Sequence, residues 1–187
     1  MNKQNMLYER FRNTEPSSTL RINEISNKLL DEGKNVYKFG LGQSPFPVPE
    51  ILIETLKKNA HQKDYLNVSG LLKLREVVAK YHSKKNLHNY SEDNVIIGPG
   101  SKELIFQCQM VTEMPLLLPK PSWVSYEPQA KILKKDVNWI DTSKNTNWHL
   151  SANALRDYCK NNKYKSQLLI LNSPNNPTGT NNQELEE

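Results

Sequence analysis

Apolar positions along the chain follow two alternating spacings, one typical of helices and one typical of strands. An apolar residue at every third or fourth position indicates a helix with one buried face, whereas a short apolar run indicates a strand. The helical spacing predicts helices over residues 18–33, 50–60, 71–85, 101–112, 122–133 and 151–162. Strands are predicted over residues 36–42, 94–98, 115–119, 136–141 and 166–171.

Strands and helices that take turns in this way predict a layered α/β fold with a largely parallel sheet. In such sheets ligands bind outside the carboxyl ends of the strands, in the loops that lead into helices. Three loops follow predicted strands, and their sequences are GPGSK, PKPSW and NSPNNPTG. We therefore expect the chemistry of the protein to lie in these loops.

Composition narrows the class of protein without identifying it. The 187 residues are 36% apolar and 24% charged, which is enough for a packed core. No apolar stretch approaches the length of about 18 residues that a membrane helix needs, and the polar N-terminus has no signal-peptide core, so we expect a soluble, cytoplasmic protein. The net charge of +5 comes mainly from scattered Lys, and the two cysteines have no metal-ligand spacing. We expect neither a nucleic-acid partner nor a metal site.

The loop GPGSK has the features of an anion-binding site. Gly98 and Gly100 stand between a predicted strand and a helix, so the first N–H groups of the helix lack intrahelical partners and lie at the positive end of its dipole. Phosphate is the natural ligand, with Ser101 adding a hydroxyl group and Gly100 allowing a close approach. A tight turn with Ser101 only as N-cap explains this stretch equally well, and the common nucleotide-binding glycine motifs are absent.

The other two loops supply an aromatic surface and rigid amide groups. Trp123 opens a helix, where its indole can lie flat against a planar ligand, although a single Trp is more often part of a core. Pro174 and Pro177 stiffen a loop whose Asn residues can present oriented amides, although a capped turn uses the same residue types. Because the three loops are expected at one edge of one sheet, we interpret them together as a pocket for a planar, phosphorylated aromatic cofactor.

Five stretches also carry a resemblance to a known family: GLGQSPFPVPE, DYLNVSGLLKLREVVAKYH, NVIIGPGSKELIF, PKPSWVSYEPQ and LLILNSPNNPTGT. In this order and spacing, from about Ser18 to Glu184, they resemble the N-terminal half of class I/II aminotransferases, which are pyridoxal-phosphate (PLP) enzymes of fold type I. The resemblance implies a three-layer α/β sandwich around a mostly parallel sheet, incomplete in this chain. It assigns residues 1–45 to an N-terminal arm, helix and first strand of the small domain, and residues 46–187 to the PLP-binding large domain.

Carried over position by position, the resemblance implies a set of contacts to pyridoxal 5'-phosphate. Gly100, Ser101 and Lys102 bind the phosphate, with Lys102 contributing its backbone amide and not its ammonium group. Trp123 stacks on the pyridine ring, and Asn176 donates a hydrogen bond to the phenolate oxygen.

Other positions imply a second subunit and a substrate site. Tyr65 reaches the phosphate of the neighbouring subunit's cofactor in the family, which implies a homodimer with shared active sites. Gly42 lies near the carboxylate of the substrate. The peptide bonds before Pro121 and Pro177 are expected to be cis, as they often are in the family.

The function that the resemblance implies is amino-group transfer between an amino acid and a 2-oxo acid. In the family the Schiff-base lysine lies downstream of the NPTG motif, and this chain has no match for it, because Lys144 precedes that motif. We therefore expect a fragment that is inactive alone and that aggregates or partly unfolds. Two alternatives remain: a PLP-dependent lyase or synthase of the same superfamily, and a non-catalytic truncated module that is stable as written.

Overall fold

The computed structural model describes Tyr8, residues 17–85 and residues 88–181. By its internal contacts the chain divides into two units, Met1–Tyr65 and Leu66–Glu187, which are described separately below. The boundary predicted between residues 45 and 46 concerns the domains of the family and stays a prediction. Most of the predicted N-terminal arm lies outside the described residues.

Two helices form the regular structure of the first unit in its described residues. They are α2 (Ser18–Asp31) and α3 (Glu50–Asn59). The turn after α2 contains Gly33 at a φ of 79°, where the N–H groups of Gly33 and Lys34 donate to the carbonyls of Leu30 and Leu29. This left-handed cap satisfies carbonyls at the helix end. Both helices predicted in this unit are confirmed.

The strand predicted over residues 36–42 is wrong. The structure assigns no strand to this segment, and the side chains of Tyr37 and Phe39 are exposed. An apolar alternation becomes a strand only where a neighbouring strand pairs with its backbone groups. The described residues of the first unit contain no such partner.

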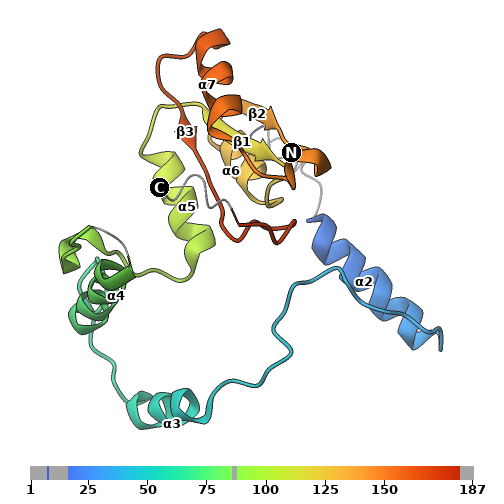
Figure 1. Ribbon diagram of the computed structural model, residues 1–187. Helices are drawn as coiled ribbons and strands as arrows, with labels where there is room; N and C mark the ends of the chain where they lie inside the picture. The colour runs from blue at the N-terminus through green and yellow to red at the C-terminus, as the bar shows by residue number, and fades with distance from the viewer. Residues whose placement is uncertain (1–7, 9–16, 86–87, 182–187) are drawn as a thin grey trace, which may run out of the picture. The chain divides into compact units, whose positions relative to one another are not determined.

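The second unit is built around a three-stranded parallel sheet (Figure 1). Its elements are α4 (Leu72–Lys85), η2 (Glu92–Asn94), α5 (Ser101–Met110), β1 (Leu116–Lys120), α6 (Tyr126–Ile132), β2 (Val137–Asp141), η3 (Lys144–Thr146), α7 (Ala152–Asn161) and β3 (Leu168–Leu169). The strand order is β2-β1-β3, and Leu116 of β1 lies opposite both Val137 and Leu168. Parallel strands need crossover connections: α6 lies in the connection from β1 to its neighbour β2, and α7 in the connection from β2 to β3 on the other side of β1.

Two strand predictions in this unit need correction. Residues 94–98 form no strand. Asn94 belongs to the 3-10 helix η2, and the N–H of Ile97 donates to the carbonyl of Ser69, at 2.9 Å. β3 is shorter than the predicted 166–171, because only Leu168 and Leu169 pair with β1 as a ladder. The strands at 115–119 and 136–141 and the four helices of this unit are confirmed, with ends that shift by a few residues.

Helices cover both faces of the sheet. Leu116 and Leu118 pack with Tyr126 and Ala130 of α6, and Ile105 of α5 lies against this cluster. On the opposite face, alternate positions of the strands pack under α7. The residues there are Leu117, Ile140 and Leu150, with Leu155 and Tyr158 of α7 beside them. This arrangement of helix, sheet and helix is the expected layered α/β fold, and it gives the loops at the strand ends a rigid base.

Candidate functional site

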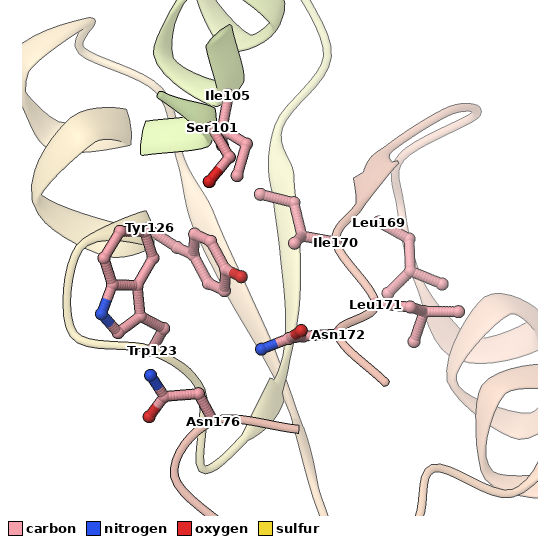
Figure 2. A pocket seen from close by; sticks show the side chains of 9 residues that line it. All are labelled: Ser101, Ile105, Trp123, Tyr126, Leu169, Ile170, Leu171, Asn172 and Asn176. Carbon is pink, nitrogen blue, oxygen red and sulfur yellow. The ribbon is translucent and has the colours of Figure 1, made fainter. Parts of the chain in front are cut away.

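A pocket of about 560 Å³ lies where the carboxyl ends of β1 and β3 meet the start of α5 (Figure 2). It is lined by Ser101, Ile105, Trp123, Tyr126, Leu169, Ile170, Leu171, Asn172 and Asn176. The lining draws on all three loops that the sequence singled out. Ligands of parallel α/β sheets bind at this edge, because the loops that lead into the helices gather there.

The first turn of α5 forms one end of the pocket. Gly100 precedes this turn at a φ of 115°, and a Cβ atom built on it would have no atom within 4 Å. The N–H groups of Glu103 and Leu104 donate to the carbonyl of Gly100, at 3.2 and 3.4 Å. The backbone N–H groups of Ser101 and Lys102 make no hydrogen bond within the described residues. They stand at the positive end of the helix dipole, where an anion is stabilised.

An aromatic pair forms one wall of the pocket. The rings of Trp123 and Tyr126 meet edge to face, with centroids 5.3 Å apart and planes at 82°. Tyr126 is only 5% exposed, yet its hydroxyl group makes no hydrogen bond within the described residues and faces the pocket in Figure 2. Burial raises the pKa of Tyr126, so the phenol stays protonated at neutral pH and can donate a hydrogen bond to a ligand.

The side chain of Lys102 belongs to this wall as well. Its ammonium nitrogen lies 5.4 Å from the centroid of the Trp123 ring, within the range of a cation–π contact. The exposed ammonium group is thereby directed over the indole ring. This geometry is compatible with the expectation that Lys102 offers a ligand its backbone amide.

The loop after β3 is held by its own asparagines. The amide of Asn175 donates to the carbonyl of Pro121 at 3.3 Å and to the hydroxyl of Thr178 at 2.8 Å. With its amide oriented to satisfy both groups, Asn172 donates to the carbonyl of Pro174 and accepts from the backbone N–H of Asn176. The side-chain amide of Asn176 makes no hydrogen bond within the described residues, so it is available to a ligand.

The prolines of these loops follow cis peptide bonds. The bonds before Pro121 and Pro177 are cis, as the resemblance implies, and the bond before Pro174 is cis as well.

The structure thus brings together Ser101, Trp123 and Asn176 in one pocket, with Gly100 and Lys102 at its edge. Tyr65 and Gly42 belong to the first unit, and their predicted roles stay predictions.

Sequence reasoning missed two polar residues that line the pocket, Tyr126 and Asn172. A signal existed for Tyr126, because it lies one helical turn after Trp123 and so can share its side of the helix. Asn172 gave no signal, since it reads as an ordinary turn residue.

The described residues contain neither a membrane-spanning helix nor a metal-binding cluster. None of their helices has the length and apolarity to cross a membrane. In the same part of the chain, no cluster of His, Cys, Asp and Glu side chains has the geometry to hold a metal ion.

Comparison with solved structures gives the same fold. A structure of aspartate aminotransferase from Thermus thermophilus with maleate superposes with a TM-score of 0.81 at 23% identity, covering 91% of this chain and 45% of that one. Aspartate aminotransferase from Thermotoga maritima gives a TM-score of 0.78 at 27% identity, covering 91% of this chain and 46% of that one. Both matches support the fold type expected from the sequence, an α/β sandwich around a mostly parallel sheet.

Comparison with sequences leads to a family. A probable aspartate/prephenate aminotransferase from Rhizobium leguminosarum bv. phaseoli is 30% identical over 173 residues, which are 88% of this chain and 42% of that protein. The chain spans less than half the length of the curated relatives that it matches. The model of the family described as aminotransferase class I and II matches residues 28–186. The chain therefore belongs to the class I and II aminotransferase family.

Proposed function

We propose that the protein is a PLP-dependent aminotransferase that moves an amino group between an amino acid and a 2-oxo acid. The observation that carries the proposal is the pocket itself, which combines the indole of Trp123 with three groups that make no hydrogen bond within the described residues: the backbone amides of Ser101 and Lys102 and the side-chain amide of Asn176. When bound, PLP supplies the conjugated ring that takes up electrons from the substrate. The work left to the chain is to bind, orient and polarise this ring.

The residues of the pocket fit such a cofactor. The open space beside Gly100 lets a phosphate group approach the two amides closely, and Ser101 adds a hydroxyl group. Trp123 offers an indole against which a pyridine ring can stack. Asn176 would donate to the phenolate oxygen, and the protonated Tyr126 adds a second donor on the same wall.

The finer parts of the proposal rest on the resemblance. Tyr65 would bind the phosphate of the cofactor in a partner subunit, so the whole protein would be a homodimer, and Gly42 would lie beside the carboxylate of the substrate. A cytoplasmic location is part of the same proposal. Aspartate is the first amino donor to test, because the names of several relatives contain it.

The test is an amino-transfer assay on the whole protein that carries this chain. Purified protein, loaded with PLP, is supplied with 2-oxoglutarate and one amino acid at a time from a panel of aspartate, asparagine, alanine and tyrosine. Formation of glutamate together with the matching 2-oxo acid supports the proposal. Loss of CO2 or of a side-chain fragment without glutamate would favour the lyase or synthase alternative.

A second measurement concerns the 187 residues alone. After incubation with PLP and reduction with borohydride, mass spectrometry should find no lysine that carries the cofactor specifically. One uniquely modified lysine, for example Lys144, would contradict the expectation that the cofactor-binding lysine lies outside these residues. A soluble, monomeric chain that unfolds in one sharp two-state transition would favour the non-catalytic alternative.

A further inference from the structure

Two buried glutamines lie between the helices behind the pocket. Gln109, in α5, is fully buried with 0% exposure, and Gln129, in α6, is 8% exposed. Amide side chains are mostly exposed in proteins, because burying them has a free-energy cost unless their hydrogen bonds are replaced. A pair of buried amides at one helix contact therefore needs a structural or functional explanation.

Gln129 ties α6 to both ends of α5. Its amide nitrogen donates to the backbone carbonyl of Lys102, at 2.8 Å, and its amide oxygen accepts from the amide nitrogen of Gln109, at 3.0 Å. Lys102 and Gln109 lie about two helical turns apart on one face of α5. Helical side chains generally lean toward the N-terminus of their helix, a direction that favours such a contact.

The hydrogen bonds of Gln129 form a bridge between two elements that border the pocket, the first turn of α5 and helix α6. Lys102 belongs to the turn whose N–H groups face an anion, and α6 begins at Tyr126, directly after the loop that carries Trp123. We infer that the Gln109–Gln129 pair is a positioning element that fixes the anion-binding turn of α5 relative to the aromatic wall of α6. The inference rests on the proposed function, because the spacing that the pair fixes matters only for a ligand that has both a phosphate group and an aromatic ring.

Packing alone does not account for the pair. The amide oxygen of Gln109 is buried without a hydrogen-bond partner in the described part of the chain. Such an unsatisfied group has a free-energy cost, and an apolar side chain of similar shape would fill the same space without it. Hydrogen bonds of fixed geometry instead select one helix spacing, since a donor and an acceptor must meet within a few tenths of an ångström.

The experiment compares three probes, PLP, pyridoxal and inorganic phosphate, by equilibrium dialysis on the whole protein freed of cofactor. Gln129→Met removes both bonds of the bridge while keeping most of the volume. The matched control is Gln107→Met, because Gln107 is an exposed glutamine of the same helix whose side-chain amide donates to Glu103. Circular dichroism and thermal unfolding of each variant show whether it folds.

If the bridge sets the spacing, Gln129→Met weakens PLP binding by about tenfold, whereas phosphate and pyridoxal, which each touch one end only, lose less than about threefold. Gln109→Met keeps the bond from Gln129 to Lys102 and shows a smaller loss, which provides a second test if the first variant does not fold. Gln107→Met binds all three probes as the unsubstituted protein does.

Three results would overturn the inference. They are unchanged PLP affinity in Gln129→Met or Gln109→Met, equal losses for all three probes, and an equal loss of PLP affinity in Gln107→Met. An unsubstituted protein that binds none of the probes would overturn the proposed function itself, and the inference with it. Probe binding by the unsubstituted protein thus distinguishes an error in the inferred role of the glutamine pair from an error in the proposed function.

Discussion

Two neighbouring asparagines in the loop after β3 should separate ligand binding from loop stability. Asn175 uses its amide inside the protein, with hydrogen bonds to the carbonyl of Pro121 and the hydroxyl of Thr178. The amide of Asn176 lines the pocket and makes no hydrogen bond within the described residues. Asn175→Ala and Asn176→Ala remove the same atoms one position apart, so each is the control for the other.

The contacts set the expected sizes of the two effects. Asn175→Ala removes two hydrogen bonds in a half-buried position, for a loss of about 1–2 kcal/mol in the free energy of unfolding. In a domain of roughly 150–250 residues, Tm then falls by about 2–4 °C for each kcal/mol. Asn176→Ala removes no side-chain hydrogen bond of the described residues, so Tm should stay within about 1 °C. It removes a hydrogen bond to an anionic oxygen, which should weaken PLP binding by about 1.4 kcal/mol, or tenfold.

Both assays use the whole protein freed of cofactor: thermal unfolding followed by circular dichroism, and equilibrium dialysis of PLP. We expect Asn175→Ala to lower Tm, and Asn176→Ala to lower PLP affinity at unchanged Tm. The reasoning is refuted if Asn176→Ala lowers Tm as much as Asn175→Ala does, because its amide would then have an internal partner. Unchanged PLP affinity in Asn176→Ala would remove its proposed role.

Three further predictions concern single groups. Burial raises the pKa of Tyr126, so folding favours its protonated form. The resulting stabilisation is present below the unfolded pKa of about 10 and is lost as pH rises through the folded value. Between pH 9 and 11, the Tm of Tyr126→Phe should therefore fall less than the Tm of the unsubstituted protein. Ser151→Ala removes the bond from the Ala154 N–H to the Ser151 hydroxyl at the start of α7, and should lower the free energy of unfolding in urea by about 1 kcal/mol. Gly70→Ala adds a Cβ atom 2.5 Å from the Cβ of Ile97 at a φ of 98°, and should destabilise by about 2–4 kcal/mol in the same urea assay, whereas no loss would show that this backbone is free to shift.

The sequence predicts the buried centre of the fold well and its margins poorly. The run Leu116–Leu118 is apolar at every position, which is typical of a strand covered on both faces, and the structure places helices on both. Residues 36–42 and 94–98 carry similar patterns without forming strands. An apolar pattern indicates which positions are suited to burial, but it does not report whether a partner strand is present to cover them and to complete the backbone hydrogen bonds.

The same limit applies to the pocket. Ser101, Trp123 and Asn176 were found because glycine, tryptophan and proline-flanked asparagine stand out in loops after strands. Gln109 and Gln129 could not be found, because a glutamine on a helix reads as a solvent-facing residue. Only their contact across two helices shows that they are buried and joined.

The asparagines of the loop after β3 show how a local sequence can divide two tasks that look alike in composition. Asn172 and Asn175 satisfy backbone and hydroxyl groups of the protein, which holds the loop against the end of β1. Because those two amides already make hydrogen bonds, the loop does not need the amide of Asn176, which has no hydrogen bond within the described residues. A free donor held in place by its neighbours binds a ligand without the entropic cost of first becoming ordered. Such a division predicts that extra flexibility at Asn172 or Asn175 would weaken ligand binding indirectly, while Asn176 acts on the ligand directly.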